Sequence, residues 1–531
     1  MKRILSLLLC LSICFGFLYV PDGFTANAAT SAKVYVICAN PGEDCNTQVG
    51  ISWHADFDCT DCFVEYKLAS DNGWENVTRV DGVYNDTDYK YFLGNSFAGS
   101  SAEPYFSEDH KFLNYGVDLD GLTPATRYKY RIGDGFGNYS ATRYFKTSGA
   151  SEYSFIWISD FHTYSPLGGR LSGATSAVAY AASQSTNGID MIFSTGDTVA
   201  YGGSHYFWKQ LYNVNWIKNY LYIDLNGNHD NMNNTNTNNT FNYFRITHNN
   251  PENCYLGGSS TPYEPGVVYY FMYNDILWFV FDNETMNATI RAQVQEWAGN
   301  VIKSKEGQFK YLFISEHYQW FNGNSGSDSH YGNWADFCDE YGVDIAFAGN
   351  NHIYARTHRI YDGQVVDANG NKGTYYIQAA SSDCERGTTG TLVTPATYNN
   401  DILAYRYKNT ADPARTHGVS LLTVTKDGIR LKLFGSENAS QTSPSFSLKD
   451  EILITPKRAD VNRVPVEEPD TKGDVNNDGT VDNLDAAAIL KYDAGIIDEL
   501  PAVADVNGDG YYDNLDATKI LKYDAGLIDS L

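Results

Sequence analysis

Between Ser151 and about residue 440, short apolar runs of strand length alternate with helix-like segments. The runs read FIWIS, DMIFS, YLYIDL, LWFVFD, YLFIS and DIAFA, and the segments between them include TSAVAYAASQS and IRAQVQEWAGNVIKS. Buried strands that alternate with helices are typical of an α/β fold, in which helices cover the faces of a sheet. The alternation predicts an α/β domain over residues 151–440.

Polar side chains stand directly after several of these strands. Open α/β sheets build their sites outside the carboxyl ends of the strands. One such residue alone is usually part of a turn or a hydrogen-bonded structural group. Carboxylates, amides and imidazoles that follow five strands in order indicate a metal centre instead. The residues are Asp160, His162, Asp197, Asn228, His229, His317, Asn350 and His352.

The segment ahead of this domain, residues 33–148, is rich in Tyr, Val, Thr and Phe. QVGISW, FVEYKLA, RYKYRIGDG and ATRYFKTS alternate in polarity between turn residues, which predicts strands. GLTPATRYKYRI, Gly121 to Ile132, is similar to fibronectin-like domains. We expect a β-sandwich here that serves as a spacer or support.

Residues 1–29 have the pattern of a secretory signal peptide. Lys2 and Arg3 precede an apolar run from Ile4 to Val20, and ANAA at positions 26–29 offers a cleavage site of small residues. A membrane anchor is the alternative interpretation. The pattern predicts a soluble, exported chain, because no second long apolar segment is found in the sequence.

An exported chain can form disulfide bridges between its cysteines. Cys38, Cys45, Cys59 and Cys62 cluster after the signal peptide, and one or two local bridges are expected among them. The Cys59–Cys62 spacing also suits zinc, but no second such pair exists and a structural role is favoured. An odd number of cysteines leaves at least one thiol free or paired between chains. The others after the signal peptide are Cys254, Cys338 and Cys384.

The formal net charge is −26, and loss of Lys2 and Arg3 with the signal peptide would make it −28. A chain this acidic repels nucleic acid and anionic membranes on average, so neither is expected as a partner. Much of the acid lies in two runs near the C-terminus, which points to cations.

Those runs belong to an internal repeat with a period of 31 residues: DVNNDGTVDNLDAAAILKYDAGIID from Asp474 recurs as DVNGDGYYDNLDATKILKYDAGLID from Asp505. Each copy places oxygen donors at the EF-hand loop positions, with Gly at position 6 and Asp, not Glu, at position 12. Two copies in register argue against a merely solvated acidic tail. The predicted calcium ligands are Asp474, Asn476, Asp478, Thr480, Asp482 and Asp485 in the first loop and Asp505, Asn507, Asp509, Tyr511, Asp513 and Asp516 in the second.

Each loop leads into one helix, and no helix precedes it. This duplicated unit, residues 473–531, follows a polar stretch with Pro that is predicted to be a linker, residues 441–472. It resembles a type I dockerin. The resemblance implies two Ca²⁺ ions and a cohesin partner on the scaffold protein of a cellulosome. By family position the cohesin contacts would be Asn483, Leu484, Lys491, Tyr492, Asn514, Leu515, Lys522 and Tyr523.

The residues after the strands resemble, as a set, the calcineurin-like metallophosphoesterases and, among them, the purple acid phosphatases. FAGNNHIYAR resembles that group's Gly-His-x-His-x-Tyr-x-Arg, and THGVSLLTV, Thr416 to Val424, resembles its late segment. A β-sandwich ahead of the catalytic domain is the same group's arrangement. The resemblance covers roughly residues 35–440.

The resemblance implies two transition-metal ions, Fe, Zn or Mn, of which the second could be weakly held. Two cations roughly 3.5–4 Å apart can polarise a phosphoryl group and lower the pKa of a bound water. His229 would face the phosphate as transition-state stabiliser or proton donor, and His330 would lie on the substrate side or, alternatively, be an exposed loop residue. The ligands carried over are Asp160, His162 and His352 for the first metal, Asp197 for both, and Asn228, His317 and Asn350 for the second.

Three positions depart from the family pattern. Asn350 stands where the family has a second-metal His, and an amide is a poorer ligand than imidazole for such ions. Purple enzymes have a tyrosinate three residues after the bridging Asp, where this chain has Ala200, with Tyr201 one later. His162 adds an imidazole that the plant enzymes lack at the first metal. We therefore expect a relative without the purple colour.

Taken together, the sequence predicts a secreted, scaffold-attached metallophosphoesterase that acts on phosphate monoesters. A phosphodiesterase or nucleotidase is the alternative within enzymes, because the same dinuclear site serves all of them. A catalytically decayed metal-binding module is the alternative outside enzymes. Asn350 favours decay, whereas the remaining set of ligands argues against it.

Overall fold

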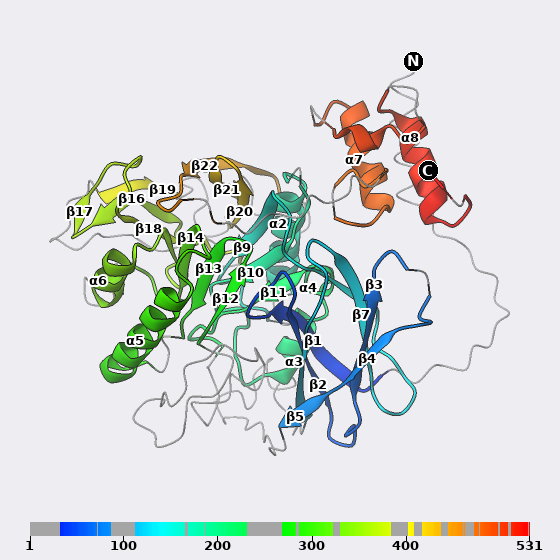
Figure 1. The fold of residues 1–531 in the computed structure, drawn as a ribbon, viewed down its shortest axis with the longest axis horizontal. Coiled ribbons are helices and arrows are strands. Elements are labelled where there is room, and N and C mark those ends of the chain that lie inside the picture. Colours follow the sequence, from blue (N-terminus) through cyan, green and yellow to red (C-terminus); the bar gives the residue numbers. More distant parts are fainter. Residues whose placement is uncertain are drawn as a thin grey trace.

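The structure is a computed structural model in which two β-rich domains lie against each other and a small helical domain lies above them (Figure 1). It describes residues 32–71, 73–85, 112–164, 168–185, 187–230, 268–282, 286–321, 330–383, 402–407, 417–436, 444–459, 461, 472–476, 478–497, 500–507, 511–528 and 530–531. The predicted signal peptide, residues 462–471 of the predicted linker, Cys254, Cys384 and Asp509 lie outside these residues.

The N-terminal domain is the predicted β-sandwich. Its two antiparallel sheets enclose Trp53 and Tyr115, whose rings stack at 5.0 Å, together with Tyr130. One sheet has the order β1-β2-β6-β5 and consists of β1 (Val34–Pro41), β2 (Val49–Asp56), β6 (Phe112–Leu119) and β5 (Val83–Asn85). The other has the order β4-β3-β7-β8 and consists of β4 (Thr78–Asp81), β3 (Phe63–Leu68), β7 (Arg127–Gly133) and β8 (Arg143–Lys146).

The cysteines of this domain form no bridges, so the prediction of local disulfides is wrong for the described residues. The buried thiols are Cys38, Cys45, Cys59 and Cys62 in this domain and Cys338 further along the chain. They pack as small apolar groups that donate weakly to carbonyl oxygens: the Cys62 Sγ lies 3.5 Å from the Cys59 oxygen. Burial raises the pKa of the Cys62 thiol to about 11, which makes it a poor nucleophile.

The central domain is the predicted α/β fold, built from two mixed sheets packed face to face. In the first sheet, β9, β10 and β11 are parallel and β20, β21 and β22 continue antiparallel beside β9. Its order is β11-β10-β9-β20-β21-β22, with bounds Leu221–Ile223, Met191–Ser194, Tyr153–Ile158, Gly418–Thr425, Gly428–Ser436 and Phe446–Ile454.

In the second sheet, β13, β14, β15 and β18 are parallel, and β12, β16, β17 and β19 pair antiparallel at its two sides. Its order is β12-β13-β14-β15-β18-β16-β17, with β19 on β16. The bounds are β12 Tyr269–Tyr273, β13 Ile276–Val280, β14 Tyr311–Ser315, β15 Ile345–Ala348, β18 Thr374–Gln378, β16 Ala355–Tyr361, β17 Gln364–Val365 and β19 Leu403–Arg406.

Helices cover the outer face of each sheet, so the domain has four layers. Apolar residues of α2, α3 and α4 pack against the first sheet, and those of α5 and α6 pack against the second. The two inner faces share an aromatic core that includes Trp157, Phe193, Trp278 and Phe347, and this core continues into the sandwich. The helices are α2 (Gly169–Ala182), α3 (His205–Leu211), α4 (Asn215–Asn219), α5 (Ala288–Ser304) and α6 (Tyr331–Tyr341).

The sheet extends beyond residue 440, where a linker was predicted. Residues Phe446–Ile454 form β22, which pairs with β21 along its whole length. β22 is the edge strand of this sheet, and its sequence FSLKDEILI is only partly buried: Leu448 and Leu453 are exposed, whereas Asp450 is buried. Further on, Arg458 pairs with buried Asp344 at 2.8 Å, which ties the chain to the start of β15.

The C-terminal domain has the two predicted helices, α7 (Asn483–Asp493) and α8 (Asn514–Asp524), and a short 3-10 turn, Ala502–Ala504. Each helix begins in a capping box, with Asp482 or Asp513 as the N-cap. The two helices enclose an apolar core of their own, which includes Val475, Ile489, Val506 and Ile520. The domain therefore has an independent, if small, core.

One buried ion pair joins this domain to the sandwich. The Arg127 guanidinium, on β7, lies 2.8 Å from Asp478 Oδ2, and both side chains are almost fully enclosed. Arg127 also donates to the Asp478 carbonyl at 3.3 Å and lies over the Tyr144 ring. The first acidic loop is thus seated on the sandwich, beside β3 and β7 (Figure 1).

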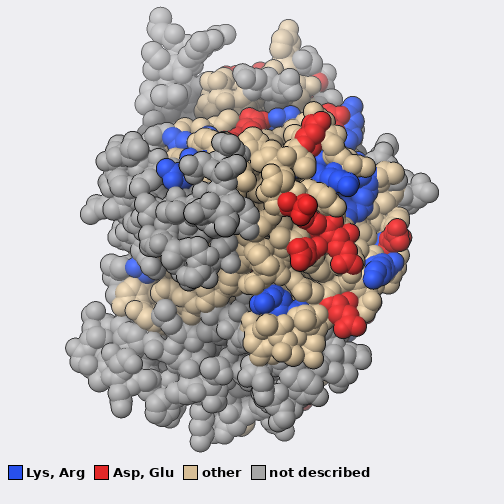
Figure 2. Space-filling view, turned by 90° about the vertical axis from the view of Figure 1, so that its left-hand side faces the viewer, with Lys and Arg blue, Asp and Glu red and all other residues tan. Residues whose placement is uncertain are grey.

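The described surface agrees with the charge of the chain. Figure 2 shows the face on which α5, α6 and β17 lie: acidic side chains gather to the right of its centre, with a group of basic side chains above them. Within the described residues, none of the helices combines the length and the apolar character that a bilayer crossing requires.

Candidate metal centre

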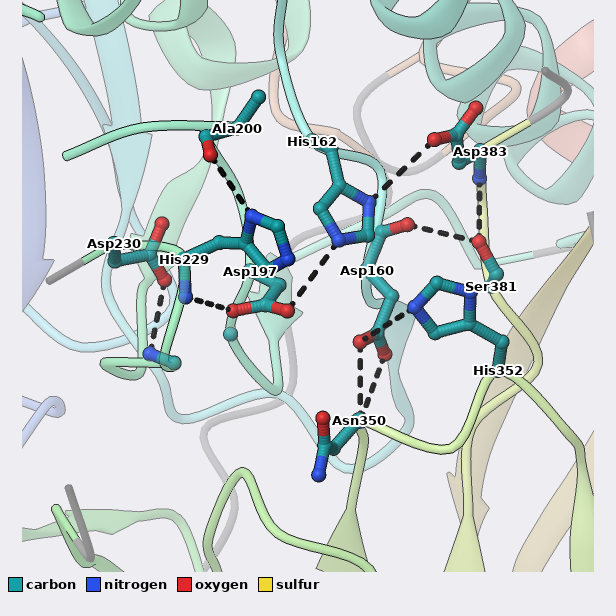
Figure 3. Close-up of polar contacts among 12 residues, drawn as sticks. Asp160, His162, Asp197, Ala200, His229, Asp230, Asn350, His352, Ser381 and Asp383 are labelled. Atoms are coloured by element: carbon teal, nitrogen blue, oxygen red, sulfur yellow. Dashed lines mark hydrogen bonds and ion pairs between the residues drawn. The ribbon is translucent and has the colours of Figure 1, made fainter. Parts of the chain in front are cut away.

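The residues predicted as ligands lie on the turns that follow parallel strands. Strand β9 is followed by Asp160 and His162, β10 by Asp197, β14 by His317, and β15 by Asn350 and His352. Because the carboxyl ends of parallel strands point the same way, the turns of both sheets meet at one edge of the domain. There the carboxylates and imidazoles turn toward one another (Figure 3).

The backbone of these turns is left-handed at the ligands themselves. The φ angles are positive at Asp160 (52°), His162 (45°), Asp197 (53°), Asn350 (63°) and His352 (56°). Asp, Asn and His are the non-glycine residues that tolerate this conformation best. In Asp-x-His the two left-handed residues are separated by one, and both side chains turn into the same cluster. In Asn-x-His the His352 ring joins that cluster, while Asn350 contacts Asp160 through its backbone N–H (Figure 3).

A glycine beside the Asp197 carboxylate is required by space. A Cβ on Gly227 would lie 2.4 Å from both the backbone nitrogen and Oδ1 of Asp197. Instead, the His229 N–H donates to Asp197 Oδ1 at 2.7 Å, which locks the turn after β11 against the turn after β10.

Three groups of side chains each place their ligand atoms within 4.8 Å of one another: Asp160 with His162 and His352, His162 with Asp197 and His229, and Asp160 with Asp197 and His317. Asp197 lies between two imidazoles, 3.3 Å from His162 Nε2 on one oxygen and 3.3 Å from His317 Nε2 on the other. His352 Nε2 lies 3.5 Å from Asp160 Oδ1.

The tautomer of His317 shows that this arrangement suits a cation. Its Nδ1 lies 2.6 Å from the Thr195 carbonyl, which can only accept a hydrogen bond, so Nδ1 carries the proton. Nε2 then presents a lone pair to the Asp197 carboxylate, and two acceptors face each other in a buried site. A proton or a metal ion must lie between them, and imidazole with carboxylate is a donor set that Zn²⁺, Fe and Mn ions accept. The residues therefore fit the predicted metal centre.

The electrostatics of the two carboxylates differ. Burial, helped by the Asp197 charge, raises the pKa of Asp160 to about 6. Burial opposes the charged form of Asp197 as well, but His317 and His162 outweigh it and hold the pKa of Asp197 well below its usual range. The anionic form of Asp197 is therefore favoured over that of Asp160.

His229 and Asn228 lie in the turn after β11, and His229 joins His162 and Asp197 in one of the three groups, while the ligand role of Asn228 stays a prediction. His229 Nδ1 lies 2.8 Å from the Ala200 carbonyl, which fixes the ring beside His162, at 4.7 Å between centroids. Asn228, half-buried, sits between Gly227 and His229 in the same turn. Tyr201 packs on Tyr164 and is 6.4 Å from the His229 ring, while Ala200 contributes only its carbonyl.

Asn350 is held from both ends. Its backbone N–H is shared between the two oxygens of Asp160, each at 3.1 Å. Its side-chain nitrogen donates to Gln319 Oε1 at 2.6 Å. The amide oxygen of Asn350 is the atom left to act as a ligand.

His330 lies at the start of α6, further from the carboxylates. Its Nδ1 is 3.3 Å from buried Glu316, and its ring packs on Tyr318 at 4.8 Å, next to the ligand His317. The side chain is partly exposed, and within the described residues His330 belongs to none of the three groups of candidate ligands.

Several residues that the sequence analysis did not single out support the ligands. Asp230 accepts from the backbone of Thr198, Val199 and Gly227 at 2.9–3.0 Å and so joins two ligand turns. Its place directly after His229 was a usable signal. Ser381 and Asp383 follow β18 and contact the turn that holds Asp160 and His162. Their sequence, Ser-Ser-Asp at positions 381–383, matches no motif that would have identified them.

The acidic loops of the C-terminal domain each lead into one helix, as predicted, and their role in binding calcium stays a prediction. In the first loop, Asp485 accepts from the backbone of Val475 and Asn476, and Asp474 from that of Gly479, at 2.7–2.9 Å. Burial, with the neighbouring Asp478, raises the pKa of Asp474 to about 7. Carboxylates forced together in this way fit Ca²⁺, a cation that prefers oxygen ligands.

The second loop repeats the pattern where it is described: Asp516 accepts from the backbone of Asn507 and Asp513 at 3.0 and 3.1 Å. The residues predicted to contact cohesin include exposed apolar side chains in both copies. Leu484 is 52% exposed and Leu515 is 58% exposed.

Comparison with known families agrees with this division of the chain. Residues 153–354 match the calcineurin-like phosphoesterase family, residues 36–147 the purple acid phosphatase N-terminal domain, and residues 472–523 the dockerin type I domain. The resemblances predicted from the motifs are therefore confirmed. A search of curated protein sequences found no match.

Solved structures show the same fold at low identity. A purple acid phosphatase, PPD1, from yellow lupin (Lupinus luteus) seeds is 16% identical, with 80% of this chain and 74% of that chain covered and a TM-score of 0.54. A structure of PhoD is 11% identical, with 80% of this chain and 92% of that chain covered and a TM-score of 0.53.

Proposed function

We propose that this chain, a metallophosphoesterase carried with a dockerin domain, is secreted, attaches to a cohesin-bearing scaffold and hydrolyses phosphate monoesters. The observation that carries the proposal is Asp197, an anionic carboxylate with a histidine nitrogen 3.3 Å from each of its oxygens. Such a carboxylate is suited to hold two cations close together. The dockerin domain implies calcium and a cohesin partner, and the signal-peptide pattern supports export.

In the proposed centre, Asp160, His162 and His352 would hold the first metal, Asn228, His317 and Asn350 would hold the second, and Asp197 would contact both. Two metal ions would polarise the phosphoryl group and provide a water of lowered pKa. Zn, Fe and Mn are the candidates, given the imidazole and carboxylate donors.

The chain's own contribution is orientation and proton transfer. His229 is fixed by the Ala200 carbonyl, which accepts from Nδ1, so Nε2 is the nitrogen that can serve the substrate. It would stabilise charge on the phosphoryl oxygens and, when protonated, give its proton to the leaving alkoxide. His330, held by Glu316 at the rim, would contact the substrate from the solvent side.

The test is turnover of an aryl phosphate monoester and an aryl phosphate diester by the purified chain, with added Zn²⁺, Mn²⁺ or Fe²⁺. The proposal expects the monoester to be hydrolysed faster in at least one metal and activity to disappear with a chelator. Faster diester hydrolysis would favour the phosphodiesterase alternative. No turnover of either ester in any metal would favour the decayed binding module.

A further inference from the structure

The first-metal ligands are supported from behind by a short segment after β18, residues 381–383, which the comparisons and the motifs leave without a role. Ser381, Ser382 and Asp383 are all fully buried. The Ser381 hydroxyl donates to the Asp160 carbonyl at 2.8 Å, and the Asp383 N–H donates to the same hydroxyl oxygen at 3.0 Å. This chain of hydrogen bonds holds the left-handed turn at Asp160 (Figure 3).

Asp383 also faces the side chain of His162. Its Oδ2 lies 3.5 Å from His162 Nδ1, and neither side chain is accessible to solvent. On the opposite side of the ring, His162 Nε2 lies 3.3 Å from Asp197. The imidazole is therefore placed between two carboxylates, one of which belongs to the proposed metal bridge.

A buried carboxylate beside Nδ1 decides where the proton of His162 resides. A carboxylate accepts and does not donate, so the proton is favoured on Nδ1 and the lone pair on Nε2, facing the metal. His317 reaches the same tautomer through the Thr195 carbonyl. The two imidazoles on either side of Asp197 therefore share one tautomer, with the proton on Nδ1, although a different acceptor faces Nδ1 in each.

Arg170, at the start of α2, keeps this carboxylate in place. Its Nε lies 3.2 Å from Asp383 Oδ2, and its Nη1 donates to the His162 carbonyl at 3.5 Å. The guanidinium balances the charge of Asp383, which would otherwise be a buried anion close to two others.

We propose that Asp383, paired with Arg170, is a positioning residue that fixes the tautomer and orientation of His162 for the first metal, while Ser381 fixes the backbone of Asp160. The proposal rests on the metal role proposed above for Asp160 and His162. The proposal also explains how the chain accommodates His162, the imidazole that distinguishes its Asp-x-His turn: the Asp383 carboxylate lies as an acceptor beside Nδ1, the ring nitrogen that faces away from the metal.

The experiment measures metal affinity, not turnover. The full chain and its Asp383→Asn variant are titrated with Zn²⁺ against a chelating indicator, and the number of bound ions is counted by elemental analysis. An amide can turn its NH₂ toward Nδ1 and favour the wrong tautomer, so Asp383→Asn is expected to weaken the tighter site by roughly 10- to 100-fold. The Co²⁺-loaded variant should also show a changed visible absorption spectrum, because the ligand geometry differs.

Asp344→Asn is the matched control. Asp344 is equally buried and pairs with Arg458 at 2.8 Å, but it lies just before β15, at the end of that strand remote from the ligands. It is expected to lower stability and leave Zn²⁺ affinity unchanged. If Asp383→Asn does not fold, Arg170→Gln replaces it, with a smaller but measurable loss of affinity expected.

Unchanged Zn²⁺ affinity and an unchanged Co²⁺ spectrum in a folded variant at Asp383 or Arg170 would overturn the inference. An equal loss of affinity in Asp344→Asn would also overturn it, because the effect would then be general destabilisation. A wild-type chain that binds Zn²⁺ through Asp383-dependent sites but cleaves no phosphate ester would leave this inference standing and overturn the proposed function alone.

Discussion

Individual residues at the metal centre combine two demands, since each must offer a ligand atom and also adopt a positive φ. Five of the proposed ligands do both: Asp160, His162, Asp197, Asn350 and His352. A non-glycine residue in this conformation costs about 1–3 kcal/mol, and it persists only where the surroundings enforce it. Hydrogen bonds do so here: the Asp160 N–H donates to the Gly196 carbonyl at 3.0 Å and the His162 N–H to the Asp197 carbonyl at 2.9 Å.

The division of roles between Asp197 and His229 gives the first prediction. Asp197→Asn should abolish turnover and also reduce bound metal, because a neutral amide cannot neutralise two cations. His229→Ala should lose turnover by roughly 10²-fold or more and keep its metal, because His229 is expected to act on the phosphoryl group. Turnover and metal content are measured together, with Asp190→Asn, a buried carboxylate at the other end of β10, as control. Equal metal loss in both variants would contradict the assigned roles.

Asn350 gives the second prediction. If its amide oxygen is a ligand of the second metal, that metal should be held more weakly than the first, and activity should rise with added divalent cation. Asn350→His should tighten the second site, because imidazole is a stronger donor to zinc or iron than an amide. The gain in turnover need not follow, since a tighter metal does not by itself stabilise the transition state. Equal affinities in wild type and variant, measured by metal titration, would place Asn350 outside the coordination sphere.

His417 gives a prediction for acid stability. It is fully buried just before β20, and burial, only partly opposed by Asp383, lowers the pKa of His417 to about 4. Between about pH 6.5 and 4 the unfolded chain takes up a proton that the folded chain refuses, so stability must fall as the pH falls through this window. The shift corresponds to roughly 3 kcal/mol when the window is crossed completely.

The measurement is the midpoint of chemical unfolding at several pH values between 7 and about 4, in wild type and His417→Leu. The variant should lose less stability on acidification than wild type. His358→Leu, at an exposed position on β16, should behave like wild type. Parallel pH profiles for wild type and His417→Leu would show that His417 is not the group that titrates.

At the scale of elements, the strands and the turns after them could be predicted from the sequence. The residues that hold these turns in place through hydrogen bonds could not. β9, β10, β11, β14 and β15 read as apolar runs because they are buried on both faces, and a polar residue at the end of such a run stands out. That signal singled out the candidate ligands before any geometry was known. The order of strands was not accessible, because pairings such as β9 with β20 join segments far apart in the chain.

Sequence reasoning failed where the local pattern was ambiguous. β22 was assigned to a linker because a half-exposed edge strand has as many charges as a loop. Disulfides were expected from the clustering of cysteines, which in fact pack as apolar groups. Asp383 and Ser381 carry no motif, since their importance arises only from the fold, which brings them behind residues more than two hundred positions earlier.

The C-terminal helix pair gives the fourth prediction. Calcium should add helix to residues 473–531, because gathering the buried carboxylates of the loops without a cation is unfavourable. Circular dichroism of this segment during a Ca²⁺ titration is the measurement, and Mg²⁺ at equal concentration serves as the control. A spectrum that stays constant up to saturating Ca²⁺ would contradict the calcium assignment of both loops.

At the scale of the whole molecule, the ion pair between Arg127 and Asp478 links the sandwich to the first acidic loop and gives the last prediction. The guanidinium lies 2.8 Å from an oxygen of a predicted calcium ligand, so it repels an incoming cation. Arg127→Gln should therefore raise the Ca²⁺ affinity of the first loop several-fold in the full chain and leave the second loop unaffected. Isothermal titration separates the two sites.

Arg131→Gln is the control for this prediction, because Arg131 pairs with Glu65 at 2.7 Å on the same sheet without touching the loops. Weaker calcium binding in Arg127→Gln would mean that the contact shapes the loop for calcium and does not compete with it. By linkage, calcium should loosen the contact as much as the contact weakens calcium binding.

The same contact has a mechanical consequence. A catalytic domain joined to its anchor by a linker alone sweeps a volume set by the length of that linker. A loop seated on β7 through a buried pair instead fixes the angle between anchor and catalytic body, while Leu484 and Leu515 remain exposed. The distance between the metal centre and the point of attachment is then limited to the size of the folded protein. Small-angle scattering from the intact chain should give the radius of gyration of a compact particle, and this radius should increase when Arg127 is replaced.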